Sequence, residues 1–359
     1  MTLVIAEAGV NHNGDENLAH ELIEIAASSG ADIVKFQTFK AKNLLTNNTP
    51  LADYQLRNTS SFRSQLDMLA KLELPFKTFK KLKKYSETKG IEFLSTAFDN
   101  ESLKFINTLN LERLKIPSGD LTNSPLLLLH AKTNKKLILS TGMASLDEIE
   151  LALGVIAFGY LRYSNVKPSL KNFSNAFQSP EGQKILQQKV TLLHCTSEYP
   201  APLDEVNLNA IKLLRHRFGL QVGYSDHTEG ISSAIAATAL GATIIEKHFT
   251  ANKDLEGPDH IASLDPIELR DMVQAIREVK KSLGDYVKKP SSSEIKNIKI
   301  ARKSIVANTT ISKGQKFTTK NLTTKRPGTG LSPIYYWNLI GKHADKDYKS
   351  GDLISKLIR

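Results

Sequence analysis

The sequence contains a single cysteine, Cys195, so no disulfide bond can form within the chain. This scarcity fits a reducing compartment, and we expect a cytoplasmic protein. No apolar run reaches the roughly 20 residues that a membrane helix needs, so we expect no membrane span. The first residues lack a basic segment and soon reach Glu7, which predicts a first strand and not a signal peptide.

Acidic residues are scarce in one part of the chain only. Residues 286–359 hold 16 Lys/Arg and 4 Asp/Glu, whereas the other 285 residues hold 32 Lys/Arg and 33 Asp/Glu. The formal net charge of +11 therefore belongs to the tail. Because the body is neutral, we expect no nucleic acid partner. The tail is interpreted as a Lys-rich small domain, in which one or two cations serve an anionic ligand.

Short β-branched runs alternate with helical stretches in the body of the chain. Near-continuous apolar runs, such as Val4–Ala6 and Leu137–Leu139, are typical of strands buried on both faces of a parallel sheet. Helices are predicted for Asn17–Ser29 and Ser232–Leu240, each followed by a glycine that can end it. Eight strands alternating with helices match a TIM (β/α)8 barrel, with an open doubly wound sheet as the alternative. The predicted strands are Leu3–Ala8, Ile33–Gln37, Glu92–Thr96, Arg113–Ile116, Lys136–Ser140, Val190–Cys195, Gln221–Ser225 and Ile244–His248.

A domain boundary is predicted after Gly284. Residues 286–298 are charged and rich in Ser and Pro, which is typical of a linker. We expect a catalytic barrel over residues 1–285 and a small domain over 299–359, with strands at Ser304–Ala307 and Gly314–Thr318. Because 61 residues are few for independent stability, we expect the small domain to dock on another surface.

Polar side chains follow nearly every predicted strand. In a barrel these strand ends converge on one mouth, where active sites are built. A single polar residue after a strand is usually a cap or turn residue, but polar residues at the ends of eight successive strands indicate a site. The residues at these ends are Glu7, Lys35, Gln37, Ser95, Thr96, Lys115, Ser118, Ser140, Thr141, His194, Thr196, Ser225, Asp226, His227, Lys247 and His248.

A pair of histidines ends two neighbouring strands. His227 follows the seventh predicted strand and His248 ends the eighth. Two imidazoles with water and substrate oxygens suit a borderline divalent cation such as Mn²⁺ or Zn²⁺. The vacant positions would let the metal polarise a carbonyl group. For one histidine alone, an ordinary hydrogen-bonded role is the better interpretation, but two neighbours beside Asp226 favour a metal.

Two lysines, Lys35 and Lys115, stand in apolar strands. Burying an unpaired ammonium group is costly, and an anionic partner would remove the cost. With the hydroxyls of Ser118, Ser140 and Ser225, the lysines could hold a phosphate and a carboxylate. A Schiff-base lysine and a lysine that extends to solvent from a strand end are the alternatives.

Three carboxylates and one arginine complete the candidates. Glu7, Asp120 and Asp259 could act as a general acid or base or bind sugar hydroxyls, although Asp259 could also be a turn residue. Asp226 could orient a histidine. Arg326 lies in a basic Pro/Gly loop, from which its guanidinium could reach a polar ligand.

Nine short motifs run in one order over almost the whole chain. They are Ile5–Gly14, Val34–Gln37, Lys115–Gly119, Leu139–Met143, His194–Pro200, Gly223–Thr228, Glu246–Phe249, Gly257–Asp259 and Lys325–Gly328. Through these motifs the chain resembles the sialic acid synthase family, which includes the legionaminic and pseudaminic acid synthases. The resemblance implies a TIM barrel followed by a small antifreeze-like (SAF) domain.

The resemblance also implies a reaction. Phosphoenolpyruvate would condense with N-acetylmannosamine, or with its 2,4-diacetamido-6-deoxy analogue, to give N-acetylneuraminate or N,N'-diacetyllegionaminate and phosphate. The motifs favour these two products over pseudaminate. A divalent metal is implied; we expect Mn²⁺, with Mg²⁺ and Co²⁺ as alternatives. The implied assembly is a homodimer in which the small domains are swapped.

Residue roles follow from the same resemblance. Metal ligands are His227 and His248, and Glu7 is the carboxylate that assists the reaction. Arg326 is implied to cross the dimer to the N-acetyl group of the sugar. Ser197 stands where the family can carry Asn, and Asp120 where many members carry Glu. The implied phosphoenolpyruvate contacts are Lys35, Thr96, Lys115, Ser118, Ser140 and Ser225, and the implied sugar contacts are Asp120, Tyr199 and Asp259.

Two other functions stay open at this point. A Schiff-base aldolase or lyase that uses pyruvate would need one of the buried lysines as its nucleophile. A non-catalytic protein that binds an anionic partner or ice through its basic tail would not need polar residues at eight strand ends.

Overall fold

The computed structural model of the chain describes residues 2–46, 49–51, 64–162 and 166–356. The chain forms two compact units, Met1–Gly284 and Asp285–Arg359. Among the described residues, no helix combines the length and the hydrophobicity of a membrane span. The finer division of the tail into a linker and a domain stays a prediction, and helix α14 (Ser292–Ala301) runs across its expected boundary.

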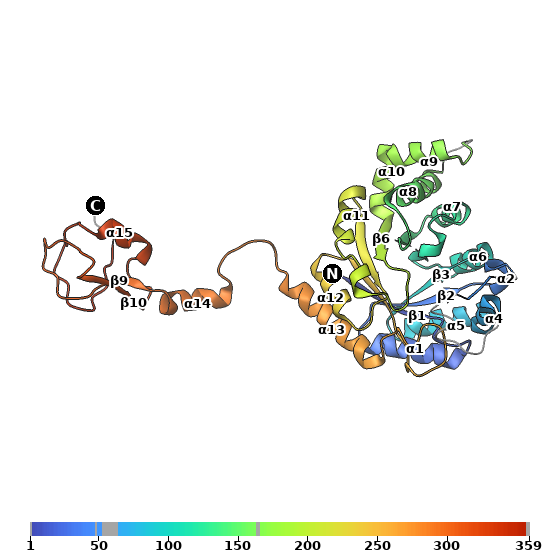
Figure 1. The fold of residues 1–359 in the computed structure, drawn as a ribbon, viewed down its shortest axis with the longest axis horizontal. Helices are drawn as coiled ribbons and strands as arrows, with labels where there is room; N and C mark the ends of the chain where they lie inside the picture. Colours follow the sequence, from blue (N-terminus) through green and yellow to red (C-terminus); the bar gives the residue numbers. More distant parts are fainter. Residues whose placement is uncertain (1, 47–48, 52–63, 163–165, 357–359) are drawn as a thin grey trace. The chain divides into compact units, whose positions relative to one another are not determined.

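The first unit is a closed barrel of eight strands in the order β1 to β8 (Figure 1). Every neighbouring pair is parallel, and β1 pairs with β8, with Glu7 opposite His248. Closure confirms the predicted TIM barrel and excludes the open sheet. The strands are β1 (Leu3–Gly9), β2 (Ile33–Thr38), β3 (Glu92–Ala97), β4 (Arg113–Ile116), β5 (Lys136–Ser140), β6 (Val190–Cys195), β7 (Gln221–Asp226) and β8 (Ile244–His248).

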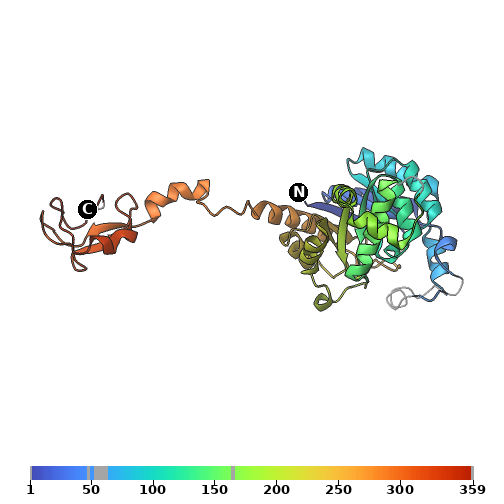
Figure 2. The same cartoon turned by 90° about the horizontal axis from the view of Figure 1, so that it is seen from above.

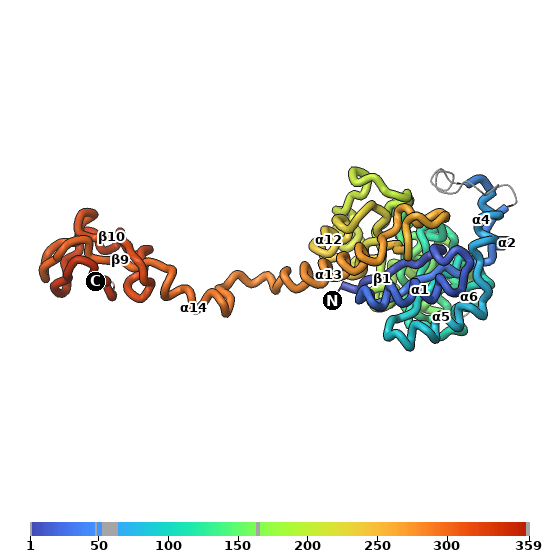
Figure 3. Tube along the Cα trace, turned by 90° about the horizontal axis from the view of Figure 1, so that it is seen from below, coloured from blue at the N-terminus to red at the C-terminus, as the bar shows by residue number. Residues whose placement is uncertain are grey.

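Helices surround the strands in both views of the barrel (Figures 1 and 2). Helix α1 begins where Asp15 accepts a hydrogen bond from the Asn17 N–H, and it lies beside α13, so the first and last helices of the unit are neighbours (Figure 3). The helices are α1 (Glu16–Ser28), α2 (Ala41–Leu44), α4 (Gln65–Leu72), α5 (Phe76–Thr88), α6 (Asn100–Thr108), α7 (Ser124–Lys132), α8 (Leu146–Leu161), α9 (Leu170–Gln178), α10 (Pro180–Lys189), α11 (Ala210–Phe218), α12 (Ser232–Ala239) and α13 (Pro266–Ser282).

An apolar layer inside the barrel supports the mouth. One large aliphatic residue from each of six strands packs into this cluster, namely Ile5, Ile33, Leu94, Ile138, Leu193 and Ile244. Side chains alternate along a strand, so the residue two positions further on also faces the barrel interior. Those next residues are Glu7, Lys35, Thr96, Ser140, Cys195 and Glu246. The strand period therefore places polar groups directly above an apolar floor.

The second unit has a small core of its own, which includes Ile305, Phe317 and Tyr348. Strand β9 (Ser304–Ala307) pairs antiparallel with β10 (Leu322–Lys325), and α15 spans Tyr336–Leu339. The strand predicted at Gly314–Thr318 is wrong.

Turn chemistry explains this error. Gly314 has a φ of +82°, and the Thr318 N–H donates to Asn321 Oδ1 at 2.7 Å. Both features bend the backbone, so only an isolated bridge between Lys316 and His343 remains.

A buried histidine on α7 makes the barrel sensitive to acid. His130 is fully buried with Nδ1 2.9 Å from the Leu126 carbonyl oxygen, and burial lowers its pKa from 6.5 to about 4. Between these values the unfolded chain binds a proton that the folded state excludes, so the free energy of unfolding falls as the pH drops from 6.5 towards 4. We expect His130→Gln to reduce the stability difference between pH 7 and pH 5 by about 2 kcal/mol in urea titrations. The same substitution at the exposed His216 should leave that difference unchanged.

Candidate active site

A cavity of about 540 Å³ opens at the carboxyl ends of the barrel strands. The described residues that line it belong to the first unit. All the predicted site residues line it except Asp120 and Arg326. Those that do are Glu7, Lys35, Thr96, Lys115, Ser118, Ser140, Ser197, Tyr199, Ser225, His227, His248 and Asp259.

Two lysines and two carboxylates form a buried ion cluster in this cavity. Lys35 Nζ lies 2.7 Å from Glu7 Oε2 and 3.5 Å from Glu246 Oε2. Lys115 Nζ lies 3.3 Å from Glu246 Oε1. Each of the four side chains is almost completely buried. The pairing removes the cost that an isolated buried ammonium group would carry, as the sequence pattern requires.

The pKa values in this cluster show which charges are firmly held. Burial is the largest influence on the Glu246 pKa, but attraction to Lys115 and Lys35 outweighs it and lowers that pKa to about 2. Burial raises the pKa of Glu7 despite Lys35. Burial lowers the pKa of Lys115, whereas Glu246 and Glu7 outweigh burial and raise the pKa of Lys35. Lys115 is thus the cation that would gain most from an anionic ligand.

Glu246 was not among the predicted site residues. It joins both lysines, and its Oε1 also accepts a hydrogen bond from Ser225 Oγ at 2.9 Å. A signal for it was present in the sequence, because Glu246 stands between the inward-facing Ile244 and His248 on β8. The alternation of strand side chains places all three on the inner face.

Hydroxyl groups surround the lysines. Lys35 Nζ donates to Thr96 Oγ1 at 3.3 Å. Ser140 Oγ is buried and, within the described ranges, has no hydrogen-bond partner. Ser118 Oγ accepts a hydrogen bond from the Gly142 N–H at 3.0 Å, and a Cβ at Gly142 would lie 2.8 Å from that oxygen. Cations, hydroxyls and a close backbone approach together make a site suited to phosphate and carboxylate groups.

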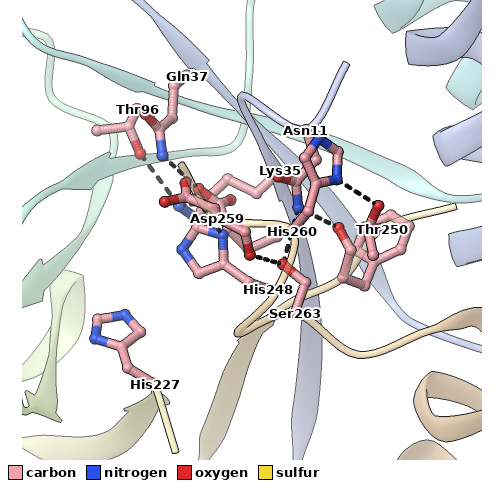
Figure 4. Close-up of polar contacts among 12 residues, drawn as sticks. Asn11, Lys35, Gln37, Thr96, His227, His248, Thr250, Asp259, His260 and Ser263 are labelled. Carbon is pink, nitrogen blue, oxygen red and sulfur yellow. Dashed lines mark hydrogen bonds and ion pairs between the residues drawn. The ribbon is translucent and has the colours of Figure 1, made fainter. Parts of the chain in front are cut away.

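The histidine pair lies beside this anion site. The ring centroids of His227 and His248 are 5.8 Å apart, and Figure 4 shows both rings at the same mouth. His227 Nδ1 lies 2.7 Å from the Thr196 carbonyl oxygen, so Nδ1 carries the proton and, in the neutral ring, Nε2 keeps its lone pair. His248 Nδ1 is buried with no hydrogen-bond partner in the described part of the chain.

These two imidazoles fit a divalent cation. Burial, with help from His227 and Lys35, holds the pKa of His248 well below its usual range, so the ring is neutral as a ligand must be. Among the described residues, no group of three or more His, Cys, Asp or Glu side chains could hold an ion. A cation between His227 and His248 would therefore keep open positions for water and substrate, as catalytic sites do.

Asp259 lies on a loop after β8 and faces the histidines. Its Oδ2 is 3.9 Å from His248 Nδ1, and burial together with the charge of Glu7 raises its pKa to about 6. Ser263 Oγ donates to the Asp259 carbonyl oxygen at 2.6 Å, and Asn11 Nδ2 donates to Ser263 Oγ at 2.9 Å (Figure 4). The loop is thus fixed to the end of β1, and Asp259 can hold or release a proton near neutral pH.

Several further side chains complete the lining. The Tyr199 ring packs on His227 with centroids 4.1 Å apart, and Gln37 Nε2 donates to Glu7 Oε1 at 3.1 Å. Cys195 Sγ lies 3.7 Å from His227 Nδ1. Gln37 was among the strand-end residues but was given no role, and Cys195 was absent from the predicted site, although the inward alternation of β6 would have indicated it.

Asp226 does not orient a histidine, so that interpretation of the sequence is wrong. Its carboxylate accepts hydrogen bonds from the Tyr224 hydroxyl at 3.1 Å and from the Thr228 N–H at 2.9 Å, and it pairs with Lys247 at 3.0 Å. The physical reason is the strand period. Asp226 and Lys247 lie one residue out of phase with the inward-facing Ser225 and Glu246, so both point towards the helix layer.

Two predicted residues are not among the described residues that line the cavity. Asp120 is half-buried in the short 3-10 helix Ser118–Asp120 and accepts a hydrogen bond from Asn123 Nδ2 at 3.0 Å. Arg326 belongs to the second unit, where it is exposed and its Nε donates to the Ala301 carbonyl oxygen at 3.0 Å. Their roles as sugar contacts stay predictions.

Family models match both units of the chain. The NeuB family model matches residues 22–288, and the SAF domain model matches residues 302–356. The chain is 53% identical over 353 residues to the N,N'-diacetyllegionaminic acid synthase of Campylobacter jejuni, covering 98% of both chains. It is 42% identical to the protein of the same name from Legionella pneumophila, covering 97% of this chain and 92% of that one.

A solved structure gives the same result. The N-acetylneuraminic acid synthetase of Leptospira borgpetersenii superposes with a TM-score of 0.66 at 33% identity, covering 83% of this chain and 90% of that one. Both domains match family models, and the chain covers at least nine-tenths of the length of these relatives. The chain therefore belongs to the NeuB family, the family of the sialic acid and legionaminic acid synthases.

Proposed function

We propose that the protein condenses phosphoenolpyruvate with 2,4-diacetamido-2,4,6-trideoxymannose to give N,N'-diacetyllegionaminate and phosphate. The carrying observation is the buried Lys35–Glu246–Lys115 cluster beside the His227–His248 pair in one cavity. The choice of sugar rests on the 53% identity to the Campylobacter jejuni legionaminic acid synthase, against 31% to the pseudaminic acid synthase of the same organism. N-Acetylmannosamine is the alternative sugar.

Different groups in the cavity would serve different parts of the reaction. Lys35 and Lys115, with the nearby hydroxyls, hold the phosphate and carboxylate of phosphoenolpyruvate at the floor of the cavity. Mn²⁺, when bound between the histidines, would supply Lewis acidity at the sugar aldehyde. Asp259, whose pKa is raised to about 6, is placed to give the aldehyde oxygen its proton.

The bond changes then follow in sequence. C3 of phosphoenolpyruvate attacks C1 of the sugar, and the positive charge that develops at C2 would be stabilised by the carboxylates Glu7 and Glu246 of the same cavity. Water adds to C2 and gives up a proton to Glu7, whose raised pKa suits a base. The bond between C2 and the phosphate oxygen then breaks while the C2 hydroxyl gives its proton to the departing phosphate, which releases phosphate and leaves the keto group. The fixed cations keep both substrates aligned through these steps.

The test is a substrate panel with phosphate release as its measurement. With phosphoenolpyruvate and Mn²⁺, we expect turnover with the diacetamido sugar to exceed that with N-acetylmannosamine, and EDTA to stop both reactions. No phosphate release with any acetamido sugar would refute the synthase. Trapping of pyruvate on a lysine by borohydride would support the aldolase in its place.

We also propose a cytoplasmic homodimer in which the second unit of each chain completes the partner's site. The second unit is small and exposes Ile334 and Trp337, which are 76% and 74% accessible. Such apolar groups on a basic unit fit a surface that docks on protein. Arg326, on the loop with Pro327 and Gly328, would then contact the N-acetyl group of the sugar.

This assembly predicts a specific kinetic change. Arg326→Ala should raise the KM for the sugar roughly tenfold through loss of a charged hydrogen bond, with the KM for phosphoenolpyruvate unchanged. Steady-state kinetics with each substrate varied in turn would measure it. Lys320→Ala, which removes another exposed cation of the same unit, should change neither value. Unchanged sugar kinetics in Arg326→Ala would remove the second unit from the site.

A further inference from the structure

One wall of the cavity is apolar, in contrast to the buried ion cluster formed by the two lysines and two carboxylates. Helix α4 contributes Met68, Leu69 and Leu72 to the lining, with the amide Gln65 at its first turn, and Val10 and Phe98 add to it from the loops after β1 and β3. Val10, Met68 and Leu72 are buried in one hydrophobic cluster, against which the half-buried Leu69 and Phe98 pack. We call these five residues the α4 wall. No charged side chain of the described lining comes from α4.

The place of the wall around the barrel indicates which part of a substrate it meets. The anion-binding groups come from β2 to β7, and His227 and His248 come from the ends of β7 and β8. Strand β1 follows β8 around the closed barrel, with Glu7 opposite His248. With the sugar aldehyde at the histidines and phosphoenolpyruvate on the lysines, the other carbons of the sugar would have room to extend past Glu7 towards Val10 and α4.

The proposed sugar has a feature that suits such a surface. A 6-deoxy sugar ends in a methyl group, whereas N-acetylmannosamine ends in a hydroxymethyl group. Transfer of a methyl group from water to an apolar wall lowers the free energy of binding, whereas a hydroxyl group placed there loses its hydrogen bonds to water. A phosphate at the same carbon would lose still more.

We propose that the α4 wall is the specificity subsite for the C6 end of the sugar, which accepts a methyl group and discriminates against hydroxyl and phosphate groups. This inference rests on the proposed function, because it assumes the orientation set by phosphoenolpyruvate and the histidine pair. Leu69 is the best single probe, since it lines the cavity, is only half-buried and lies on the helix surface.

The experiment compares 2-acetamido-2,6-dideoxymannose with N-acetylmannosamine, which differ only in the C6 hydroxyl. For the wild-type homodimer with Mn²⁺ and phosphoenolpyruvate, kcat/KM should be about tenfold higher for the deoxy sugar than for N-acetylmannosamine. Leu69→Asn, which keeps the shape but adds an amide, should remove most of this preference. Val10→Thr, an isosteric change at the other side of the wall, should reduce it in the same direction.

Controls separate the wall from folding and from the reaction itself. Leu69→Met should retain the preference, and Leu151→Asn, the same change at a half-exposed position on α8, should leave it intact. All variants should keep the wild-type KM for phosphoenolpyruvate, and thermal unfolding reports whether each one is folded. Equal kcat/KM values for both sugars in the wild type, or an unchanged ratio in folded Leu69→Asn and Val10→Thr, would overturn the inference. If the wild type released no phosphate with either sugar or with 2,4-diacetamido-2,4,6-trideoxymannose, the proposed function itself would be wrong.

Discussion

Replacement of His248 by alanine is expected to lower kcat/KM for the sugar about a thousandfold. The substitution removes one of the two imidazoles that would hold the cation, and His227 alone leaves it weakly bound. Lewis-acid polarisation of a carbonyl is worth several kcal/mol, and about 4 kcal/mol corresponds to this change in rate. The measurement is phosphate release during a Mn²⁺ titration, combined with the metal content of the purified protein.

The fold should survive this change. A matched control is His216→Ala on α11, where the ring is exposed and lies outside the cavity lining. It should retain wild-type activity and metal content. If His248→Ala bound Mn²⁺ as tightly as the wild type and turned over at the same rate, the histidine pair would not be the metal site.

Replacement of Glu246 by glutamine is expected to lower the free energy of unfolding by about 3 kcal/mol. Glu246 is the carboxylate with which Lys115 forms its ion pair, and it also lies 3.5 Å from Lys35. A neutral amide leaves the buried Lys115 ammonium without that charge, and an uncompensated buried charge is among the most destabilising single changes. Urea unfolding at pH 7, with and without phosphoenolpyruvate, measures the effect.

The ligand makes this test specific. If phosphate and carboxylate groups bind at the lysines, phosphoenolpyruvate should stabilise Glu246→Gln more than it stabilises the wild type, because it supplies the missing negative charge. Glu21→Gln, at an exposed position on α1, should change neither stability nor the response to the ligand. Equal stabilisation of both proteins by phosphoenolpyruvate would separate Glu246 from the anion site.

Much of the barrel could be predicted because strand signals are local. Buried parallel strands are short apolar runs between turn residues, and each of the eight predicted barrel strands agrees with the observed one within a residue at either end. The error at Gly314–Thr318 has a local cause too, because β-branched and aromatic residues there resemble a strand while Gly314 and Asn321 bend the chain. Short irregular domains offer little periodicity to distinguish the two.

The sequence predicted some residues of the candidate site and missed others. Polar residues that follow strands were found because their position in the sequence marks them, as with His227 and His248. Glu246 was missed although it stands within the β8 run, and Asp226 was misinterpreted although it also ends a strand. A residue at a strand end faces either the barrel interior or the helices, and one position along the strand decides between them.

By itself the sequence determined the alternation of strands and helices, the basic tail, and the chemical groups available at the strand ends. These properties depend on neighbours within a few residues, through backbone geometry and the burial of apolar runs. The tertiary structure alone decided that β1 closes on β8 and that Glu246 forms ion pairs with two lysines, one from β2 and one from β4. It also decided that apolar residues of α4 line the same cavity as His227 and His248. Ion pairing and cavity shape depend on distances between segments remote in the chain, and only the closed barrel fixes those distances.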